Sequence, residues 1–284
     1  MPPQSSDWLW TIECQLKGAG ARASKCNCME RPSIFDIHIH VLGQPALDAE
    51  FVEFAREWRM PFAASCLGAE GQMLVDPTLD QCRQANDLTL SVMESEPDLA
   101  HGFCYVSQAH GQHAIEEVRR CIRAGMKGIK IWVAVKCNDP RTFPIAEEAQ
   151  SLGVPILIHS YLRWEEVLPG ESKPREIAEL AVRYPEVKII MAHMAFRWKE
   201  GVDAVADHPN ILVDTSGMDP ELGSVEYAVE NLGADRVLFG SDAPGRDVLC
   251  QIGRVMAADI SPDDREKILH TNSEKLLGLA GGAQ

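Results

Sequence analysis

Short apolar runs rich in β-branched residues alternate along this chain with amphipathic stretches of helical period. The apolar runs have the length of buried strands, and the stretches between them place apolar residues on one face of a helix. Eight strands are predicted, at Ile34–His40, Phe62–Leu67, His101–Val106, Gly128–Val133, Pro155–His159, Lys188–His193, Ile211–Thr215 and Arg236–Ser241. Helices are predicted between them at Ala49–Arg59, Leu79–Glu94, Ile115–Ala124, Phe143–Leu152, Pro174–Tyr184 and Val225–Leu232.

The residues at the helix ends support these boundaries. Gly125, Gly153 and Gly233 follow helical runs, where glycine enters the left-handed region at little cost. Pro185 and Pro209 also follow helical runs and end them, because proline cannot donate the next backbone hydrogen bond.

Strands that each precede a helix pair in parallel through right-handed crossovers, and eight such units close into a (β/α)₈ (TIM) barrel. An open doubly wound sheet would show a glycine-rich phosphate loop after its first strand, whereas this first strand ends in His-Ile-His. We therefore predict an α/β protein with one barrel domain at residues 33–284. Residues 1–32 form a short N-terminal extension without a clear pattern.

Composition and charge limit the classes of partner and the cellular compartment that we expect for this protein. The 284 residues carry a formal net charge of −15, which argues against a nucleic-acid or anionic membrane surface. No apolar run approaches the length of a membrane span, and the N-terminus lacks the features of a signal peptide. The nine scattered cysteines favour a reduced compartment, so we expect a cytoplasmic protein.

Candidate chemistry is concentrated at the ends of four predicted strands. His38 and His40 end the first strand, and their spacing by two places them on one face. His159, His193 and Asp242 end the fifth, sixth and eighth strands. A single buried histidine is more often a core residue, but several histidines at the same end of a barrel indicate a site. The predicted site therefore lies at the C-terminal face of the barrel.

The segments DIHIH, GIK, IHS, MAH and GSDAP, followed by HTNSEKLLGL (270–279), resemble the amidohydrolase superfamily. More narrowly, the chain resembles the amidohydrolase-2 branch, which includes metal-dependent hydrolases, lactonases and aromatic-acid decarboxylases. The resemblance runs over about residues 33–279 and implies a divalent metal, usually zinc. It implies as ligands His38, His40, His159 and Asp242.

These residue types suit that chemistry. Neutral imidazoles are good zinc ligands, and three of them leave a position for water or substrate. Asp242 could bind the metal and accept a proton from bound water, while His193 could hold a developing oxyanion. Asp36, two residues before His38, is a candidate to support the site or simply a structural anchor.

Lys130 in the segment GIKIW leaves the number of metal ions open. A carboxylated lysine would bridge two ions, and His193 would then join His159 on the second. Otherwise Lys130 pairs with Asp242 or with substrate, and the site holds one ion. We expect one ion.

The side chains that would bind substrate are specified less well. Trp132, Arg163 and Arg197 follow predicted strands and are expected to line the mouth of the barrel. Two arginines there would suit a carboxylate, which a guanidinium binds through two hydrogen bonds. Equally, both arginines could be solvated at helix starts.

The sequence thus predicts a metal-dependent hydrolase in which activated water attacks a C–O or C–N bond of a small carboxylated substrate. The alternative on the same metal site is a nonoxidative decarboxylase of an aromatic or unsaturated acid. A metal-binding barrel without catalysis is a third hypothesis, which the complete ligand set disfavours. No nucleic-acid or membrane partner is expected, and the sequence leaves homo-oligomerisation open.

Overall fold

The computed structural model describes residues 31–69, 72–164, 168–217 and 221–279. Its main sheet has eight strands, and every hydrogen-bonded pair of neighbours is parallel. In sheet order they are β1 (Asp36–Val41), β2 (Phe62–Cys66), β5 (Ala100–Tyr105), β6 (Gly128–Ile131), β7 (Ile156–Ile158), β8 (Ile189–Met191), β9 (Ile211–Asp214) and β10 (Val237–Leu238). All eight predicted strands are therefore confirmed.

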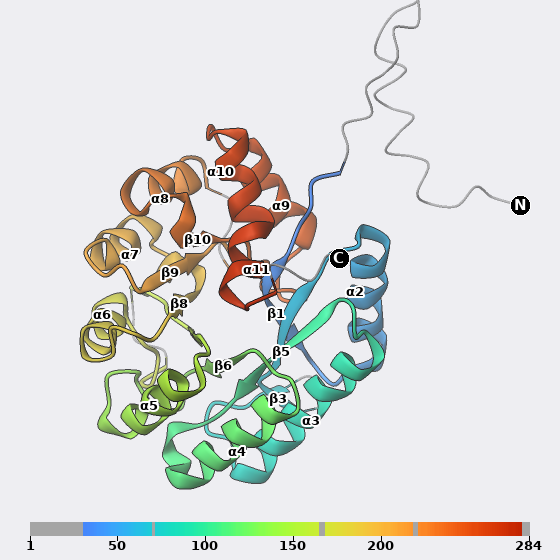
Figure 1. The fold of residues 1–284 in the computed structure, drawn as a ribbon, viewed down its shortest axis with the longest axis vertical. Helices are drawn as coiled ribbons and strands as arrows, with labels where there is room; N and C mark the ends of the chain where they lie inside the picture. The colour runs from blue at the N-terminus through green and yellow to red at the C-terminus, as the bar shows by residue number, and fades with distance from the viewer. Residues whose placement is uncertain (1–30, 70–71, 165–167, 218–220, 280–284) are drawn as a thin grey trace, which may run out of the picture. The chain divides into compact units, whose positions relative to one another are not determined.

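The segment after β10 closes the sheet against β1. Backbone hydrogen bonds join Ile37 N to Phe239 O at 2.9 Å, Asp242 N to His38 O at 2.8 Å and His40 N to Ala243 O at 2.7 Å. The closed parallel sheet confirms the predicted (β/α)₈ barrel, which Figure 1 shows with its helices arranged around the strands.

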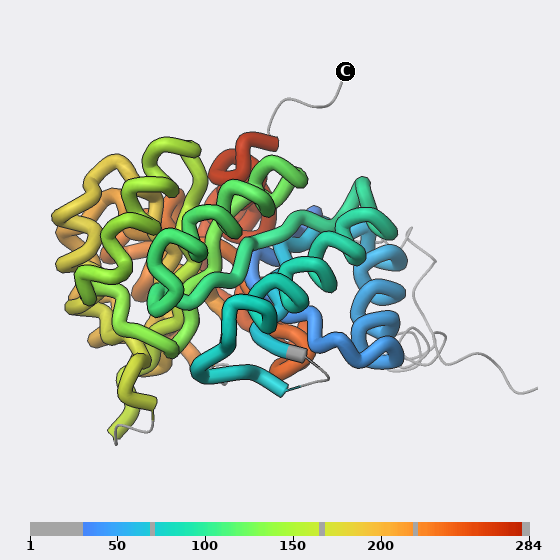
Figure 2. Tube along the Cα trace, turned by 90° about the horizontal axis from the view of Figure 1, so that it is seen from below, coloured from blue at the N-terminus to red at the C-terminus, as the bar shows by residue number. Residues whose placement is uncertain are grey.

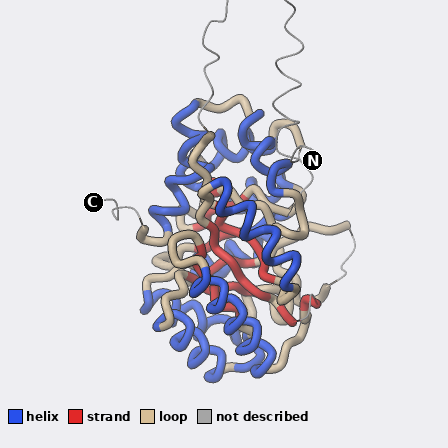
Figure 3. Tube along the Cα trace, turned by 90° about the vertical axis from the view of Figure 1, so that its right-hand side faces the viewer, coloured by secondary structure: helices blue, strands red, loops and turns tan. Residues whose placement is uncertain are grey.

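The helices lie outside the strands, as the separation of colours in Figure 3 makes clear. Each predicted helix is present, with ends displaced by up to four residues. The bounds are α2 (Pro45–Trp58), α3 (Leu79–Ser95), α4 (Gln112–Arg123), α5 (Phe143–Leu152), α6 (Pro174–Arg183), α7 (Trp198–Val205), α8 (Ser224–Leu232), α9 (Val248–Ala257), α10 (Pro262–Glu266) and α11 (Asn272–Leu276). Among the described residues, none of these helices has the length and apolarity required to cross a membrane.

Several strands are shorter than predicted, and two of these differences bear on the site. The strand predicted to reach His193 ends at Met191, and the chain then turns through residues with positive φ. The strand predicted to reach Ser241 ends at Leu238, because the following residues turn to pair with β1. A small antiparallel pair, β3 (Gly68–Ala69) with β4 (Gln72–Met73), was not predicted.

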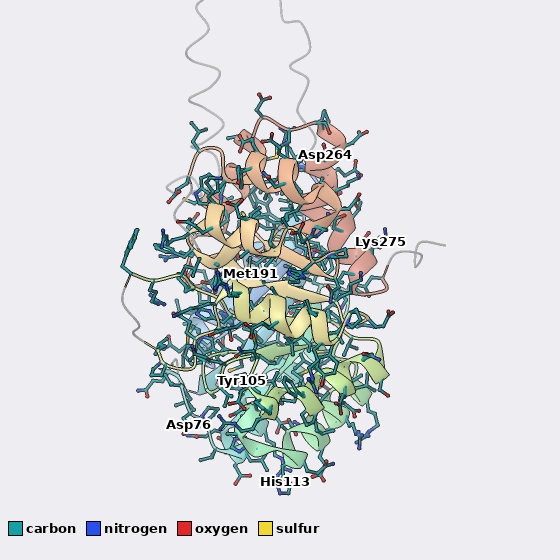
Figure 4. All side chains as sticks on the ribbon, turned by 90° about the vertical axis from the view of Figure 1, so that its left-hand side faces the viewer. Asp76, Tyr105, His113, Met191, Asp264 and Lys275 are labelled. Atoms are coloured by element: carbon teal, nitrogen blue, oxygen red, sulfur yellow. The ribbon has the colours of Figure 1, made fainter. Side chains whose placement is uncertain are left out.

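The extension predicted for residues 1–32 lies outside the described residues except for its last two, so that boundary stays a prediction. Within residues 32–284 the helices run close to one another around the barrel, as the tube in Figure 2 shows. Figure 4 places Asp76, which follows β4, and Lys275 of α11 on opposite sides of the barrel.

A buried apolar cluster underlies the predicted site. Lys130, Leu157, Ile190 and Leu212 are register partners on four adjacent strands and so point to the same side of the sheet. His159 lies two residues beyond Leu157 and shares its face. The smaller hydrophobic cluster of the barrel contains the three apolar partners, so it supports Lys130 and His159 from below.

Candidate active site

The structure brings together the five residues predicted as ligands. His38 Nε2 and His40 Nε2 lie 3.8 and 3.2 Å from Asp242 Oδ1. His159 Nδ1 lies 3.1 Å from His193 Nε2, and the ring centroids of His38 and His193 are 5.0 Å apart. Four imidazoles and one carboxylate thus face a common centre.

Backbone turns, rather than strand alternation, place two of these side chains. His193 and Asp242 both have a φ of 64°, which is uncommon for residues other than glycine. The Asp214 carboxylate accepts a hydrogen bond from His193 N at 2.8 Å and stabilises the first turn. The second turn is held by the bond from Asp242 N to His38 O.

Gly217 makes room for the His193 ring. A Cβ at this position would lie 2.0 Å from His193 Nδ1, a distance at which no side chain can be accommodated. Its φ of 69° also favours glycine. The ring of His193 therefore packs directly on the backbone that follows β9.

Each of three histidines uses one ring nitrogen to bond an acceptor outside the common centre. His38 Nδ1 lies 2.9 Å from Asp214 Oδ2, His40 Nδ1 lies 3.1 Å from Ser65 O, and His159 Nε2 lies 2.8 Å from Glu171 Oε1. An acceptor at one ring nitrogen places the proton there and leaves the other nitrogen with its lone pair. The free nitrogens face the centre, and this arrangement is typical of metal-binding histidines.

His193 is held by a hydroxyl group. Ser216 Oγ donates to Asp214 Oδ1 at 2.5 Å and lies 2.9 Å from His193 Nδ1. Because that hydroxyl proton is engaged, the serine oxygen can accept from His193 and leave Nε2 toward the centre. The buried Asp214 therefore fixes His38 directly and His193 through Ser216.

Burial and mutual contact set the charges of this cluster. Burial lowers the pKa of His38 to about 4, and it lowers the pKa of His159 and His193 as well. For Asp242 burial alone would raise the pKa, but the nearby His193, the hydrogen bond with His40 and the nearby His38 outweigh burial and hold the pKa well below its usual range. His38, His159 and His193 are therefore expected to be neutral beside an ionised Asp242 at neutral pH.

Lys130 lies inside the cluster rather than at its edge. Its side chain is fully buried, and Nζ lies 2.8 Å from His38 Nε2. Burial lowers the pKa of Lys130 to about 8, although the charges of Asp242 and Asp214 oppose this. The direct contact is with His38, whereas the sequence suggested a pair with Asp242.

The donor set fits a divalent cation. Ligating atoms of His38, His193 and Asp242 lie within 4.8 Å of one another, and His40 adjoins Asp242 as His159 adjoins His193. Imidazole nitrogens with one carboxylate suit zinc and related transition metals. The Asp242 side chain is 21% exposed, so the centre can be reached from outside the barrel.

Aromatic rings form a wall beside the imidazoles. Tyr161 stacks on His159 with 5.1 Å between ring centroids and lies 4.9 Å from His193. Phe196 stacks on Tyr161 at 5.3 Å, and Trp132 meets His159 edge to face at 6.4 Å. Trp132, predicted to line the mouth, contacts His159, and its role toward substrate stays a prediction; the sequence analysis did not name Tyr161 and Phe196.

The two predicted substrate arginines are occupied by acidic partners. Arg163 forms an ion pair with Glu171 at 3.0 Å and covers the Tyr161 ring at 4.5 Å. Arg197 pairs with Glu200 and lies over the Trp164 ring. Their guanidinium groups stand near the mouth, but each is already neutralised by a carboxylate.

Three residues that hold the imidazoles, Asp214, Ser216 and Glu171, escaped the sequence analysis for two different reasons. Asp214 lies near the end of the strand predicted at Ile211–Thr215 and Ser216 directly follows it, so the same end-of-strand argument could have found them. Glu171 belongs to a loop after β7 and reaches His159 only because the chain returns there, bridging Ser160 and Ser172. No local pattern predicts such a return.

Comparison with known proteins agrees with this geometry. The sequence profile of the amidohydrolase family matches residues 35–279. Gamma-resorcylate decarboxylase of Rhodococcus jostii is 27% identical over 258 residues, covering 71% of this chain and 77% of that protein. The 2-amino-3-carboxymuconate-6-semialdehyde decarboxylase of Dictyostelium discoideum is 25% identical over 244 residues, covering 71% and 67%.

Solved structures share the fold. The 2,6-dihydroxybenzoate decarboxylase from Rhizobium has a TM-score of 0.72 at 18% identity, covering 89% of this chain and all of that one. A dihydroxybenzoic acid decarboxylase from Polaromonas, solved with manganese and the inhibitor 2-nitroresorcinol, has a TM-score of 0.70 at 20% identity, covering 87% and 97%. Since the family profile spans the barrel and all of its site residues, the chain belongs to the amidohydrolase family.

Proposed function

We propose that this protein is a metal-dependent nonoxidative decarboxylase of an aromatic or unsaturated carboxylic acid. The observation that carries the proposal is the ring wall of Tyr161, Phe196 and Trp132 beside the cluster of histidines and Asp242. A planar ring can pack against such a wall while its carboxylate reaches the centre. The named decarboxylases among the relatives favour this activity over the hydrolysis expected from the sequence.

The proposed cofactor is one divalent ion bound by His38, His40, His159 and Asp242. Held by these residues, a divalent ion would supply positive charge that stabilises negative charge developing on the substrate. Zinc suits these donors, and manganese is the metal of the Polaromonas structure, so metal analysis must decide between them. A single ion requires Lys130 to remain an uncarboxylated amine.

In the proposed reaction the bond between the ring carbon and the carboxylate breaks, CO₂ leaves, and a proton takes its place. Asp242 is the group suited to move that proton, because its carboxylate is ionised and 21% exposed to water. It would take a proton from solvent or from a substrate hydroxyl and deliver it to the ring carbon. His193 Nε2 would hold the substrate oxygen nearest to it.

Incubation with dihydroxybenzoates in heavy water tests the proposal. The expected products are CO₂ in the headspace and a phenol that carries one deuterium at the carbon that lost the carboxylate. Asp242→Asn should lower kcat by about 10²–10⁴, since general acid–base assistance is lost. A product without deuterium at that carbon would contradict the proposal. So would the absence of CO₂ release from every aromatic acid assayed.

Hydrolysis is the second candidate, and the exposure of Asp242 favours it, because water can reach the same carboxylate. A hydrolase would incorporate oxygen from ¹⁸O-labelled water into its organic product, whereas the organic product of a decarboxylase would carry no label. A panel of lactones and amides assayed in labelled water therefore separates the two candidates.

A further inference from the structure

Arg246 stands apart from the other arginines at the mouth of the barrel. Its guanidinium makes no ion pair within 4.0 Å of any carboxylate in the part of the chain that the structure describes, whereas Arg163 and Arg197 are both paired. Arg246 Nη2 donates a long hydrogen bond to a backbone carbonyl, that of Gly217, at 3.4 Å. An exposed guanidinium without a carboxylate partner attracts anions.

The turn that carries Asp242 also positions Arg246. The backbone N–H of Arg246 donates to Asp242 O at 3.2 Å, which closes a five-residue turn after the barrel strand. Asp247, the neighbouring acid, is engaged elsewhere, because its carboxylate accepts from Cys250 N and caps α9. The local carboxylate is therefore turned away from Arg246.

Tyr161 links Arg246 to the reacting centre. The tyrosine hydroxyl donates to Gly217 O at 2.6 Å, so it shares this acceptor with Arg246, and the tyrosine ring lies 4.9 Å from that of His193. Burial raises the pKa of Tyr161 to about 12, so the ring carries no charge that would neutralise the arginine. Tyr161 thus contacts His193 through its ring and shares a backbone acceptor with Arg246 through its hydroxyl.

We propose that Arg246 and Tyr161 form an anion subsite that binds a second negatively charged group of the substrate, at the end remote from His38 and Asp242. The ring of the substrate would lie along Tyr161, and a carboxylate at its far end would accept hydrogen bonds from the guanidinium. This inference rests on the proposed function for the aromatic nature of the ligand. It makes Arg246 a specificity-determining residue for aromatic dicarboxylates over monocarboxylates.

Binding of benzoate, benzene-1,3-dicarboxylate and benzene-1,4-dicarboxylate to the metal-loaded protein tests the subsite. Isothermal titration should show that at least one dicarboxylate binds more tightly than benzoate. In Arg246→Gln that dicarboxylate should lose about tenfold or more in affinity, because a charge-assisted bond is removed. Benzoate should change by less than about twofold, and Arg246→Lys should recover part of the loss because the charge is restored.

Arg123→Gln is the matched control, since Arg123 is an exposed arginine in the last turn of α4. It should bind all three ligands as the unaltered protein does. The proposal would be overturned if Arg246→Gln bound both dicarboxylates as tightly as the unaltered protein does. It would also be overturned if the substitution weakened benzoate binding as much as dicarboxylate binding. If Arg246→Gln selectively loses dicarboxylate affinity but no aromatic acid releases CO₂, the proposed function is wrong and the anion subsite is supported.

Discussion

Single side chains at this site are positioned by partners that never face the centre. Asp214 is fully buried, bonds His38 through one oxygen and holds the His193 backbone through the other. Burial would raise its pKa, but contact with His38 and His193 outweighs this, so the pKa is strongly lowered and the carboxylate stays charged. A charged acceptor makes the opposite nitrogen of His38 a stronger ligand.

Asp214→Asn should therefore weaken metal binding. The amide keeps the size of the side chain but loses the charge, and such partners typically contribute 10–100-fold in metal affinity. Competition with a chromogenic chelator would measure the change for zinc and for manganese. Asp139→Asn, at a loop carboxylate paired with Arg141, serves as the control. Unchanged zinc and manganese affinities in Asp214→Asn would show that His38 needs no charged partner.

For single residues, the sequence indicated which side chains gather at the site better than it indicated the backbone conformation that places them there. His38 and His40 follow from strand alternation, and the structure has both beside Asp242. His193 was assigned to a strand, yet it lies in a turn of positive φ that Asp214 and Gly217 make possible. Such a turn depends on contacts between segments distant in the chain, and local pattern does not report them.

Whole elements are joined by buried polar groups as well as by apolar packing. Glu117 of α4 accepts hydrogen bonds from Asn86 of α3 at 2.8 Å and from Arg120 at 2.7 and 2.9 Å. Asn86 in turn bonds both backbone groups of Tyr105 on β5. Two helices and a strand therefore share one hydrogen-bonded network.

Glu117→Gln should destabilise the protein in a pH-dependent way. Burial raises the pKa of Glu117, but the bonds from Arg120 and Asn86 outweigh it, so the folded pKa lies below the unfolded one. A lowered carboxyl pKa contributes stability above the unfolded value, and this contribution is lost as the pH falls through the folded value. The expected loss is about 2 kcal/mol at pH 7 and less toward pH 3.5.

Urea unfolding at both pH values would measure this effect. Glu116→Gln on the same helix is the control, because Glu116 is half exposed and pairs with His113 at the surface. Its effect should be within about 0.5 kcal/mol at either pH. A loss for Glu117→Gln that is as large at pH 3.5 as at pH 7 would mean that the charge of Glu117 contributes nothing.

Element prediction succeeded where the local signal was strong. Phe143–Leu152 was predicted with the observed bounds, because Gly153 ends the helix in the left-handed region at a φ of 65°. The strand at Arg236–Ser241 was predicted too long, because the apolar pattern continues while the chain has left β9 to pair with β1. Apolar periodicity reports burial, and it does not distinguish which neighbour provides the hydrogen bonds.

On the scale of the whole molecule, the proposed ion would connect β1 with the segments that follow β7 and β10. A ligand that binds only the folded state stabilises it by about 4 kcal/mol when present at a thousand times its Kd. For a domain of this size that corresponds to about 10 °C in Tm. Removing the metal with a chelator should lower Tm by this amount, as differential scanning fluorimetry would show.

His40→Ala provides the comparison for that experiment. It lacks one proposed ligand, so it should melt at the lower temperature with or without chelator, and added zinc should not restore it. If the chelator lowers the Tm of His40→Ala as much as that of the unaltered protein, the stabilising ion binds at another site.

The closing of the barrel by residues 239–243 has a consequence for synthesis on the ribosome. A nascent chain that has emerged through β10 contains every strand of the sheet, but it does not yet contain Asp242. The backbone of Asp242 bonds that of His38, and its carboxylate faces both histidines of β1. Contacts between segments some two hundred positions apart form slowly, because a long loop must first close. Ion uptake would therefore be a late event in folding, and bound metal would report that the first and last strands have met.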